Sequence, residues 1–163
     1  MKKIMMLFVL ATVLFTGCSK KDSNSDALKC EFVPADNTSV TLVPGEAFDV
    51  DELGLTETTE YMEAASCYYE GMDKIFTYDN YAVTTYPKDG KDYIQDISIT
   101  AEGVTTDKGV GVGSDLKQVL EAYGENYELS GKMYKYAVNG EKYLYFFIMN
   151  DVVKSYGYAI TVN

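Results

Sequence analysis

The middle of the chain alternates apolar and polar residues with a period of two, which is the pattern of half-buried strands. Lys74–Tyr78 and Tyr81–Tyr86 flank Asp79-Asn80, a dipeptide that suits a tight hairpin. A turn containing proline, glycine and lysine then leads to a third alternating run, Tyr93–Thr100. This region therefore predicts a three-stranded antiparallel meander.

The same pattern returns near the C-terminus. Lys132–Val138 and Tyr143–Met149 lie on either side of Asn139-Gly140, a strong signal for a hairpin with a type I′ turn. The next turn leads to Val152–Val162, the third strand expected in this region. The C-terminal part of the chain therefore predicts a second meander.

Between the two meanders the spacing of apolar residues becomes that of a helix. Ser114 is the expected N-cap, Asp115 places a carboxylate near the positive end of the helix dipole, and Gly124 is the expected stop. The apolar face recurs at i, i+3, i+4 and i+7 and consists of Leu116, Val119, Leu120 and Tyr123.

The pattern as a whole predicts an α+β fold made of two units, each a short helix followed by a three-stranded meander. Lys74–Tyr78 and Lys132–Tyr136 are similar position by position, although one short match can arise by coincidence. Gly45–Gly54 is interpreted as the shorter helix of the first unit, and Glu57, Glu60 and Glu63 have the spacing of one helix face. The units are expected at about 44–101 and 105–163, forming a sheet with short helices packed on one face.

The N-terminus has the features of a secretory signal. Met1-Lys2-Lys3 is followed by an apolar run, Ile4–Phe15, which is too short to span a bilayer as a stable helix. Leu14–Cys18 resembles the lipobox of bacterial lipoproteins, in which the cysteine is acylated, for example with palmitate, and becomes the new N-terminus. We therefore expect a lipoprotein signal at 1–17 and a protein anchored on the extracytoplasmic face of the cell membrane through Cys18. The alternative is an ordinary signal peptide with a chance cysteine.

A polar stretch, 18–29, follows the lipobox and is expected to be a flexible tether to a single domain, 30–163. In an exported chain the two remaining cysteines, Cys30 and Cys67, are candidates for a disulfide. The alternative is two separate thiols, because free cysteine packs as a small hydrophobic residue.

Charge narrows the classes of function. The chain carries a net charge of −11, all 14 of its basic residues are lysine, and it has no histidine. This balance opposes binding to nucleic acid, and the chain lacks the commonest general base and zinc ligand. The glycines of 109–113 do not form a phosphate-binding motif, and the acidic residues of 49–52 do not match a calcium loop. We therefore expect no cofactor and no metal.

Tyrosine is the most suggestive feature of the composition, with 15 residues in a chain that has no tryptophan. Exposed tyrosines provide the broad, rigid contact area found in binding surfaces. The candidate binding face consists of Tyr134, Tyr136, Tyr143 and Tyr145. The alternative is that tyrosine simply suits a half-buried sheet.

Three segments, Ala65–Tyr78, Thr84–Pro87 and Thr106–Gly113, resemble small surface lipoproteins of Gram-positive gut-type bacteria. The helix-plus-meander repeat of that group is similar to the fold of the secreted beta-lactamase inhibitor protein and of small outer-membrane assembly lipoproteins. The resemblance extends from about Pro44 to the C-terminus. It supplies no established function, and no inhibitory residue can be transferred to this chain.

These observations predict a lipid-anchored binding protein rather than an enzyme, and the expected partners are the membrane and another envelope or secreted protein. One alternative is a cell-envelope hydrolase that uses carboxylates, since an acidic chain supplies many candidate pairs. Another is a structural component of a surface assembly.

Overall fold

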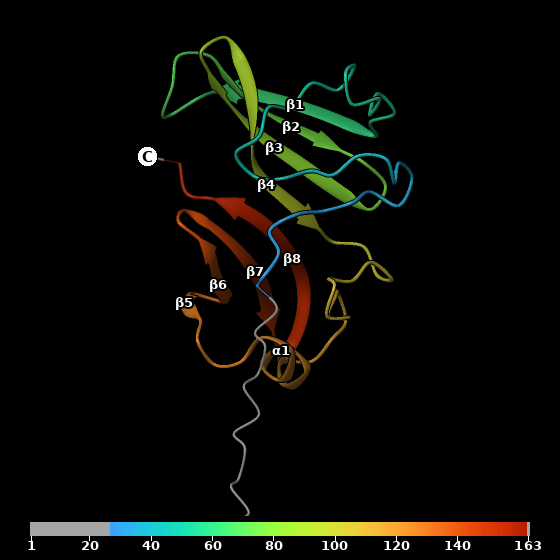
Figure 1. Ribbon diagram of the computed structural model, residues 1–163, viewed down its shortest axis with the longest axis vertical. Helices are drawn as coiled ribbons and strands as arrows, with labels where there is room; N and C mark the ends of the chain where they lie inside the picture. Colours follow the sequence, from blue (N-terminus) through green and yellow to red (C-terminus); the bar gives the residue numbers. More distant parts are fainter. Residues whose placement is uncertain (1–26, 163) are drawn as a thin grey trace, which may run out of the picture.

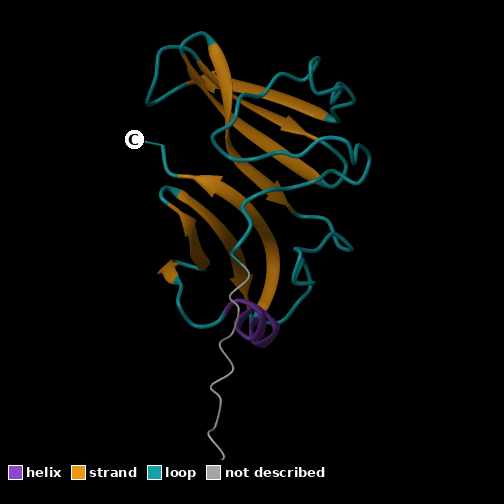
Figure 2. Cartoon of the chain, viewed as in Figure 1, coloured by secondary structure: helices purple, strands orange, loops and turns teal. Residues whose placement is uncertain are grey.

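The computed structural model describes residues 27–162, which form one eight-stranded antiparallel sheet (Figure 1). Figure 2 shows the one α-helix of the described residues at one end of the sheet. The elements are β1 (Glu60–Ala65), β2 (Met72–Thr77), β3 (Tyr81–Lys88), β4 (Lys91–Ile99), α1 (Leu116–Tyr123), β5 (Glu128–Ser130), β6 (Met133–Asn139), β7 (Lys142–Met149) and β8 (Val152–Ile160).

The sheet consists of two four-stranded meanders joined through their last strands. Its order is β1-β2-β3-β4-β8-β7-β6-β5, so β4 and β8 meet at the centre. There Ile97 lies opposite Tyr158 and Ile99 lies opposite Tyr156. The two similar stretches found in the sequence belong to β2 and β6, which are the second strands of their respective meanders.

The predicted α+β fold is wrong, because the described chain is nearly all β. The expected first helix, Gly45–Gly54, is instead a short extended piece that pairs with β4 through Ala47 and Tyr93, followed by turns. The Asp49 carboxylate accepts hydrogen bonds from the backbone N–H groups of Asp51 and Glu52 at 2.9 and 3.1 Å, which begins a helical turn. Gly54 then adopts a φ of 65° and ends it. A single turn gains too few hydrogen bonds to continue as a helix.

Each meander has four strands rather than the expected three. The sequence did not predict the outer strand of either meander, β1 or β5. β1 lies in the region where Glu57, Glu60 and Glu63 have the spacing of one helix face and the pattern was ambiguous. Every residue of β1 is exposed, so the strand carries no alternating apolar signal. β5 has 3 residues, too few to show a period.

The predicted helix after the glycine-rich segment is confirmed as α1, but its N-cap is one residue later than expected. The Asp115 carboxylate accepts a hydrogen bond from the Gln118 N–H at 2.8 Å, and the Gln118 side chain accepts one from the Asp115 N–H at 2.9 Å. This reciprocal pair is a capping box. Ser114 therefore precedes the cap, and Gly124 is the C-cap as predicted.

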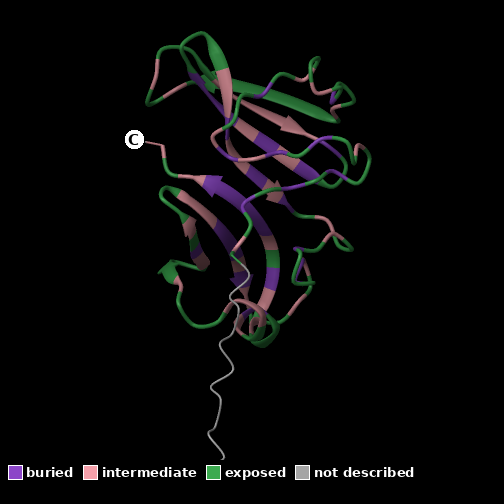
Figure 3. Cartoon of the chain, viewed as in Figure 1, coloured by how far each residue is buried: buried purple, intermediate pink, exposed green. Residues whose placement is uncertain are grey.

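The connecting segments 28–55 and 104–124 pack on the face of the sheet that carries Tyr156 and Tyr158, which we call the covered face. Phe48 contacts Phe76 of β2 with a ring-centroid distance of 5.1 Å, and Tyr123 of α1 contacts Phe146 of β7 at 5.2 Å. Most of the hydrophobic core lies in this layer. Buried residues accordingly follow β3, β4, β7 and β8 in Figure 3. We call the opposite face, which carries Asp96, Tyr145 and Gly157, the open face.

Candidate binding face

The four tyrosines predicted to form one surface lie on opposite faces of the sheet. Tyr134 of β6 is paired with Phe146 of β7, and directly paired residues share a face. Neighbouring residues along a strand point to opposite faces, so Tyr145 and its i−2 neighbour Tyr143 point away from Tyr134. Tyr134 and Tyr136 therefore lie on the covered face, and Tyr143 and Tyr145 lie on the open face.

Tyr134 and Tyr136 are part of the packing between the sheet and the segment around α1. Tyr136 is 1% exposed, and its hydroxyl donates to the Gly124 carbonyl at 3.1 Å. Its ring contacts Tyr123 with a centroid distance of 5.5 Å, while Tyr127 contacts Tyr134 at 4.8 Å. Burial raises the pKa of Tyr136 to about 12. Tyr136 therefore contributes to stability, whereas Tyr134 is half-buried and lies on the face opposite Tyr143 and Tyr145.

Tyr143 is half-buried on the open face and borders a surface hollow. The Lys135 ammonium lies over its ring, 5.0 Å from the centroid, in a cation–π arrangement. The hollow has a volume of about 400 Å³. Its lining comes from strands, the β6–β7 hairpin and the connections before β5 and after β8, and includes both charges. The residues are Asn126, Tyr127, Glu128, Lys135, Ala137, Gly140, Glu141, Lys142, Tyr143 and Thr161.

Tyr145 crosses the centre of the open face and joins the two meanders. It extends from β7 over Gly157 of β8, and its hydroxyl is hydrogen-bonded to Asp96 and Ser98 of β4. A side chain at position 157 would block this path, because a Cβ there would lie 2.6 Å from the Tyr145 hydroxyl oxygen. The Ile97 carbonyl oxygen would lie still closer, at 2.4 Å, so both the tyrosine and the β4 backbone require glycine at this position.

Burial is the main influence on the pKa values of both Asp96 and Tyr145. Desolvation raises the pKa of Asp96 to about 6, and the hydrogen bond from Tyr145 acts in the opposite direction. Burial also raises the pKa of Tyr145, and the negative charge of Asp96 adds to that rise. Tyr145 thus stays a neutral hydrogen-bond donor, while Asp96 changes charge within the range of mildly acidic conditions.

A row of stacked tyrosines lies on the open face of the first meander. Tyr86 stacks on Tyr69 and on Tyr93, with ring-centroid distances of 5.5 and 5.9 Å. The Lys88 ammonium lies 6.0 Å from the Tyr69 ring centroid. Burial is the main cause of the raised pKa of Tyr86, and Glu141 adds to it, so the β6–β7 hairpin lies near this row.

Strand register places this row on the same face as Tyr145. Thr84 of β3 is paired with Asp96, so the two share the open face. Tyr86 is two residues beyond Thr84 along the strand and is paired with Tyr93. The open face thus has aromatic residues at both ends and the Tyr145–Asp96 pair between them.

The predicted disulfide is not formed in the structure. Cys30 is buried and Cys67 is exposed, and both are free. The Cys30 thiol lies 3.8 Å from the Tyr143 carbonyl oxygen, and desolvation raises its pKa to about 11. The alternative interpretation, in which a free cysteine packs as a small hydrophobic residue, describes Cys30.

The predicted lipidation site, Cys18, and the signal at 1–17 lie outside the described residues. Within 27–162 no helix combines the length and the apolar character needed to cross a membrane. The same residues contain no group of three or more cysteine, aspartate or glutamate side chains arranged to hold a metal ion.

Sequence reasoning missed Asp96, Gly157 and the pairing of Tyr86 with Tyr93. The last of these had a usable signal, because both tyrosines flank the turn between two expected strands at equal distance from its centre. Asp96 and Gly157 had no such signal, since β4 and β8 are far apart in the sequence and their register depends on the whole sheet.

Comparison of the chain with protein-family models, with curated proteins and with solved structures found no match.

Proposed function

We propose that this protein is a lipid-anchored, extracytoplasmic interaction protein that binds a partner protein through the open face of its sheet. The observation that carries the proposal is the clustering of aromatic side chains at both ends of that face. Tyrosine rings provide large contact area at a low cost in conformational entropy, and they are enriched in protein interfaces.

The character of the face favours a protein partner. Tyr143 and Tyr93 are half-buried, so part of each side chain is exposed to solvent. Two lysines, Lys88 and Lys135, lie beside tyrosine rings and add positive charge to the face. Protein interfaces are enriched in tyrosine and also contain polar and charged side chains at their rim. The 400 Å³ hollow at Tyr143 provides a recess into which one side chain of a partner fits.

The alternative functions have weaker support. Asp96, with its raised pKa of about 6, is the feature that most favours acid catalysis. Glycoside hydrolysis, however, uses two carboxyl groups on either side of the scissile bond, and the hydrogen-bond partner of Asp96 on the open face is a tyrosine, Tyr145. A structural role in a surface assembly would use the same face and is a special case of the proposal.

The binding part of the proposal is tested by cross-linking the protein in its own cell envelope and comparing variants. Tyr143→Ser and Tyr93→Ser should each reduce capture of the partner at least tenfold. Leu129→Ser is the matched control, because Leu129 is 55% exposed and is paired with Tyr134, on the covered-face side of β5. Equal capture by all three variants, with thermal unfolding of each unchanged, would exclude the open face.

The anchoring part of the proposal is tested separately. Cys18→Ala should abolish metabolic labelling with fatty acid and release the protein from the membrane fraction. Labelling that persists in this variant would contradict the assignment of Cys18 as the acylated residue.

A further inference from the structure

β1 is an unpaired edge strand that is long enough to accept another strand. It ends the sheet, pairs with β2 on one side, and none of the isolated bridges among residues 27–162 involves it. All 6 of its residues are exposed, as Figure 3 shows. The opposite edge, β5, has 3 residues, and a short edge strand gives little template for pairing.

The backbone groups of β1 that face away from the sheet can be identified from its register. Ser66 donates its N–H to the Gly71 carbonyl at 3.0 Å, which makes these two a hydrogen-bonded pair. Hydrogen-bonded pairs alternate with non-hydrogen-bonded pairs along an antiparallel ladder. The N–H and C=O groups of Tyr61, Glu63 and Ala65 therefore point outward, where an added strand would meet them.

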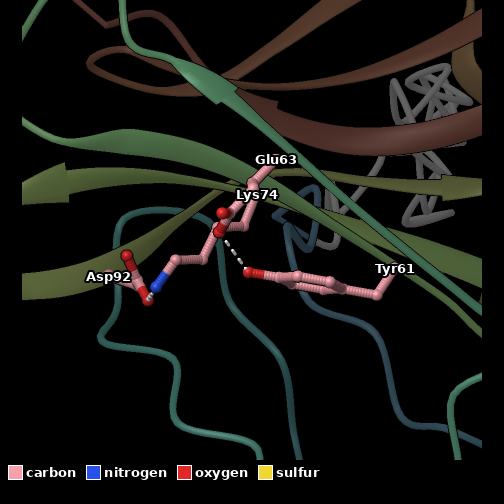
Figure 4. Close-up of polar contacts among 4 residues, drawn as sticks. All are labelled: Tyr61, Glu63, Lys74 and Asp92. Carbon is pink, nitrogen blue, oxygen red and sulfur yellow. Dashed lines mark hydrogen bonds and ion pairs between the residues drawn. The ribbon is translucent and has the colours of Figure 1, made fainter.

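The side chains along this edge combine apolar area with negative charge. Tyr61 and Met62 are 49% and 50% exposed, on opposite faces of the strand. The Tyr61 hydroxyl donates to the Glu63 carboxylate at 2.6 Å, a contact seen in Figure 4. Glu60 and Glu63 have no ion-pair partner in the part of the chain that the structure describes.

The neighbouring lysine forms its ion pair with another carboxylate and interacts with Glu63 only at longer range. Lys74 lies opposite Glu63 across the β1–β2 ladder, yet its ammonium forms an ion pair with Asp92 at 2.7 Å. Figure 4 shows the two contacts side by side, with Lys74 extended toward Asp92 and Glu63 turned toward Tyr61. The hydrogen bond to Asp92 is the main cause of the raised pKa of Lys74.

The covered-face side of β1 also offers an apolar recess. The Tyr61 ring contacts Phe76 at a centroid distance of 5.2 Å. Both rings line a hollow of about 220 Å³, together with Val50, Asp51, Leu55, Thr56 and Thr58. An apolar side chain of an added strand can contact the outer part of this hollow.

We propose that β1 binds an extended, lysine-bearing segment of a partner protein by strand addition. The outward backbone groups supply the main-chain hydrogen bonds, and Glu60 and Glu63 select positive charge. A second copy of this chain is a poor occupant, because two molecules of net charge −11 repel each other. This surface is separate from the open face and does not depend on the function proposed for it.

The test uses a capped, fluorescein-labelled peptide, Thr-Val-Lys-Val-Val-Lys, and the full chain in a zwitterionic detergent. Aligned antiparallel to β1, the peptide places its lysines opposite Glu63 and Glu60 and its final valine opposite Tyr61. We expect saturable binding by fluorescence anisotropy and slower hydrogen exchange in Glu60–Ala65. The acidic counterpart, with both lysines replaced by glutamate, should bind at least tenfold more weakly. Added salt should lower the affinity of the basic peptide for the protein.

Two changes separate strand addition from simple charge attraction. N-methylation of the first peptide lysine removes the N–H that would donate to Glu63 and should weaken binding at least tenfold. Glu63→Pro and Glu63→Gln both remove one charge, but only the proline removes an outward N–H, and proline is tolerated at such edge positions. We expect Glu63→Pro to bind at least fivefold more weakly than Glu63→Gln.

The proposal is overturned if the N-methylated and unmodified peptides bind equally, or if the acidic and basic peptides do. It is also overturned if β1 is protected from exchange without peptide and the protein sediments as a dimer, since a second copy would then occupy the edge. Tyr143→Ser should leave peptide binding unchanged, so failure of this proposal and failure of the open-face proposal are distinguishable.

Discussion

Tyr145 of β7 lies directly opposite Gly157 of β8, and its phenol ring occupies the space where a side chain at position 157 would be. The ring Cζ atom would lie 2.7 Å from a Cβ built on Gly157. Because of this vacancy, the Tyr145 hydroxyl reaches across β8 to Asp96 on the other meander. One glycine thus determines how the two halves of the open face are connected.

Gly157→Ala should lower the free energy of unfolding and displace Tyr145 from Asp96. Overpacking a well-packed site costs about 1–3 kcal/mol, and here the new Cβ would also lie 2.4 Å from the Ile97 carbonyl oxygen. Urea denaturation measures the loss of stability. The Asp96 pKa, followed by NMR, should also change in the variant because its hydrogen bond to Tyr145 is broken.

A double-mutant cycle identifies the source of the clash. If the Tyr145 ring is the main obstacle, the cost of Gly157→Ala should become smaller when Tyr145→Ala is also present. An equal cost in both backgrounds would assign the clash to the Ile97 carbonyl and would contradict the role given to the tyrosine.

Removing the Tyr156 hydroxyl should leave stability unchanged or raise it. This hydroxyl is buried and has no hydrogen-bond partner in the structure, so Tyr156→Phe deletes a desolvated polar group. Tyr136→Phe is the matched control, because it removes the hydrogen bond to the Gly124 carbonyl and should cost about 1 kcal/mol. Chemical denaturation should show that Tyr156→Phe has a higher free energy of unfolding than Tyr136→Phe. The reverse order would count against the packing described around Tyr156.

The alternation of apolar and polar residues predicted six of the eight strands. Hairpin turns such as Asp79-Asn80 and Asn139-Gly140 act locally, so their sequences report the pairing of adjacent strands. β1 was missed because an exposed edge strand buries neither face and has no apolar period. The first helix was predicted wrongly because one helical turn with a terminal glycine resembles the start of a longer helix.

The candidate site was predicted less well than the fold. Tyr143 and Tyr145 were expected to share a face with Tyr134 and Tyr136, which requires knowledge of the register between β6 and β7. A shift of one residue exchanges the two faces of a strand, and the bulge between Ala137 and Asn139 contributes to that register. Composition shows that tyrosine is abundant, but 7 of the tyrosines are buried, and only the pairing shows which they are.

The two free cysteines should differ strongly in reactivity. Iodoacetamide, added to the native protein without reductant, should modify the exposed Cys67 within minutes and leave the buried Cys30 unmodified. The raised pKa of Cys30, about 11, keeps its thiol protonated at neutral pH. Peptide mapping by mass spectrometry distinguishes the two sites. Protection of both thiols, reversed by reductant, would instead indicate that they pair.

Asp96 should make the stability of the fold depend on pH in the mildly acidic range. Its folded-state pKa is about 6 against an ordinary value of 3.8, so the folded protein favours the protonated carboxyl. The resulting stabilisation is fully present below the unfolded pKa and is lost as the pH rises through the folded pKa. Between pH 4 and 7 this group alone should lower the free energy of unfolding by about 2–3 kcal/mol.

Asp96→Asn isolates this contribution, because the other carboxyl groups titrate in both proteins. Asparagine keeps a carbonyl oxygen for the Tyr145 hydroxyl and does not ionise, so its desolvation does not vary with pH. Urea denaturation at a series of pH values should show the wild type losing stability relative to the variant as the pH rises from 4 to 7. A constant difference between the two proteins, or a wild type that gains stability with rising pH, would mean that the carboxyl is hydrated on the open face and is not desolvated beneath Tyr145.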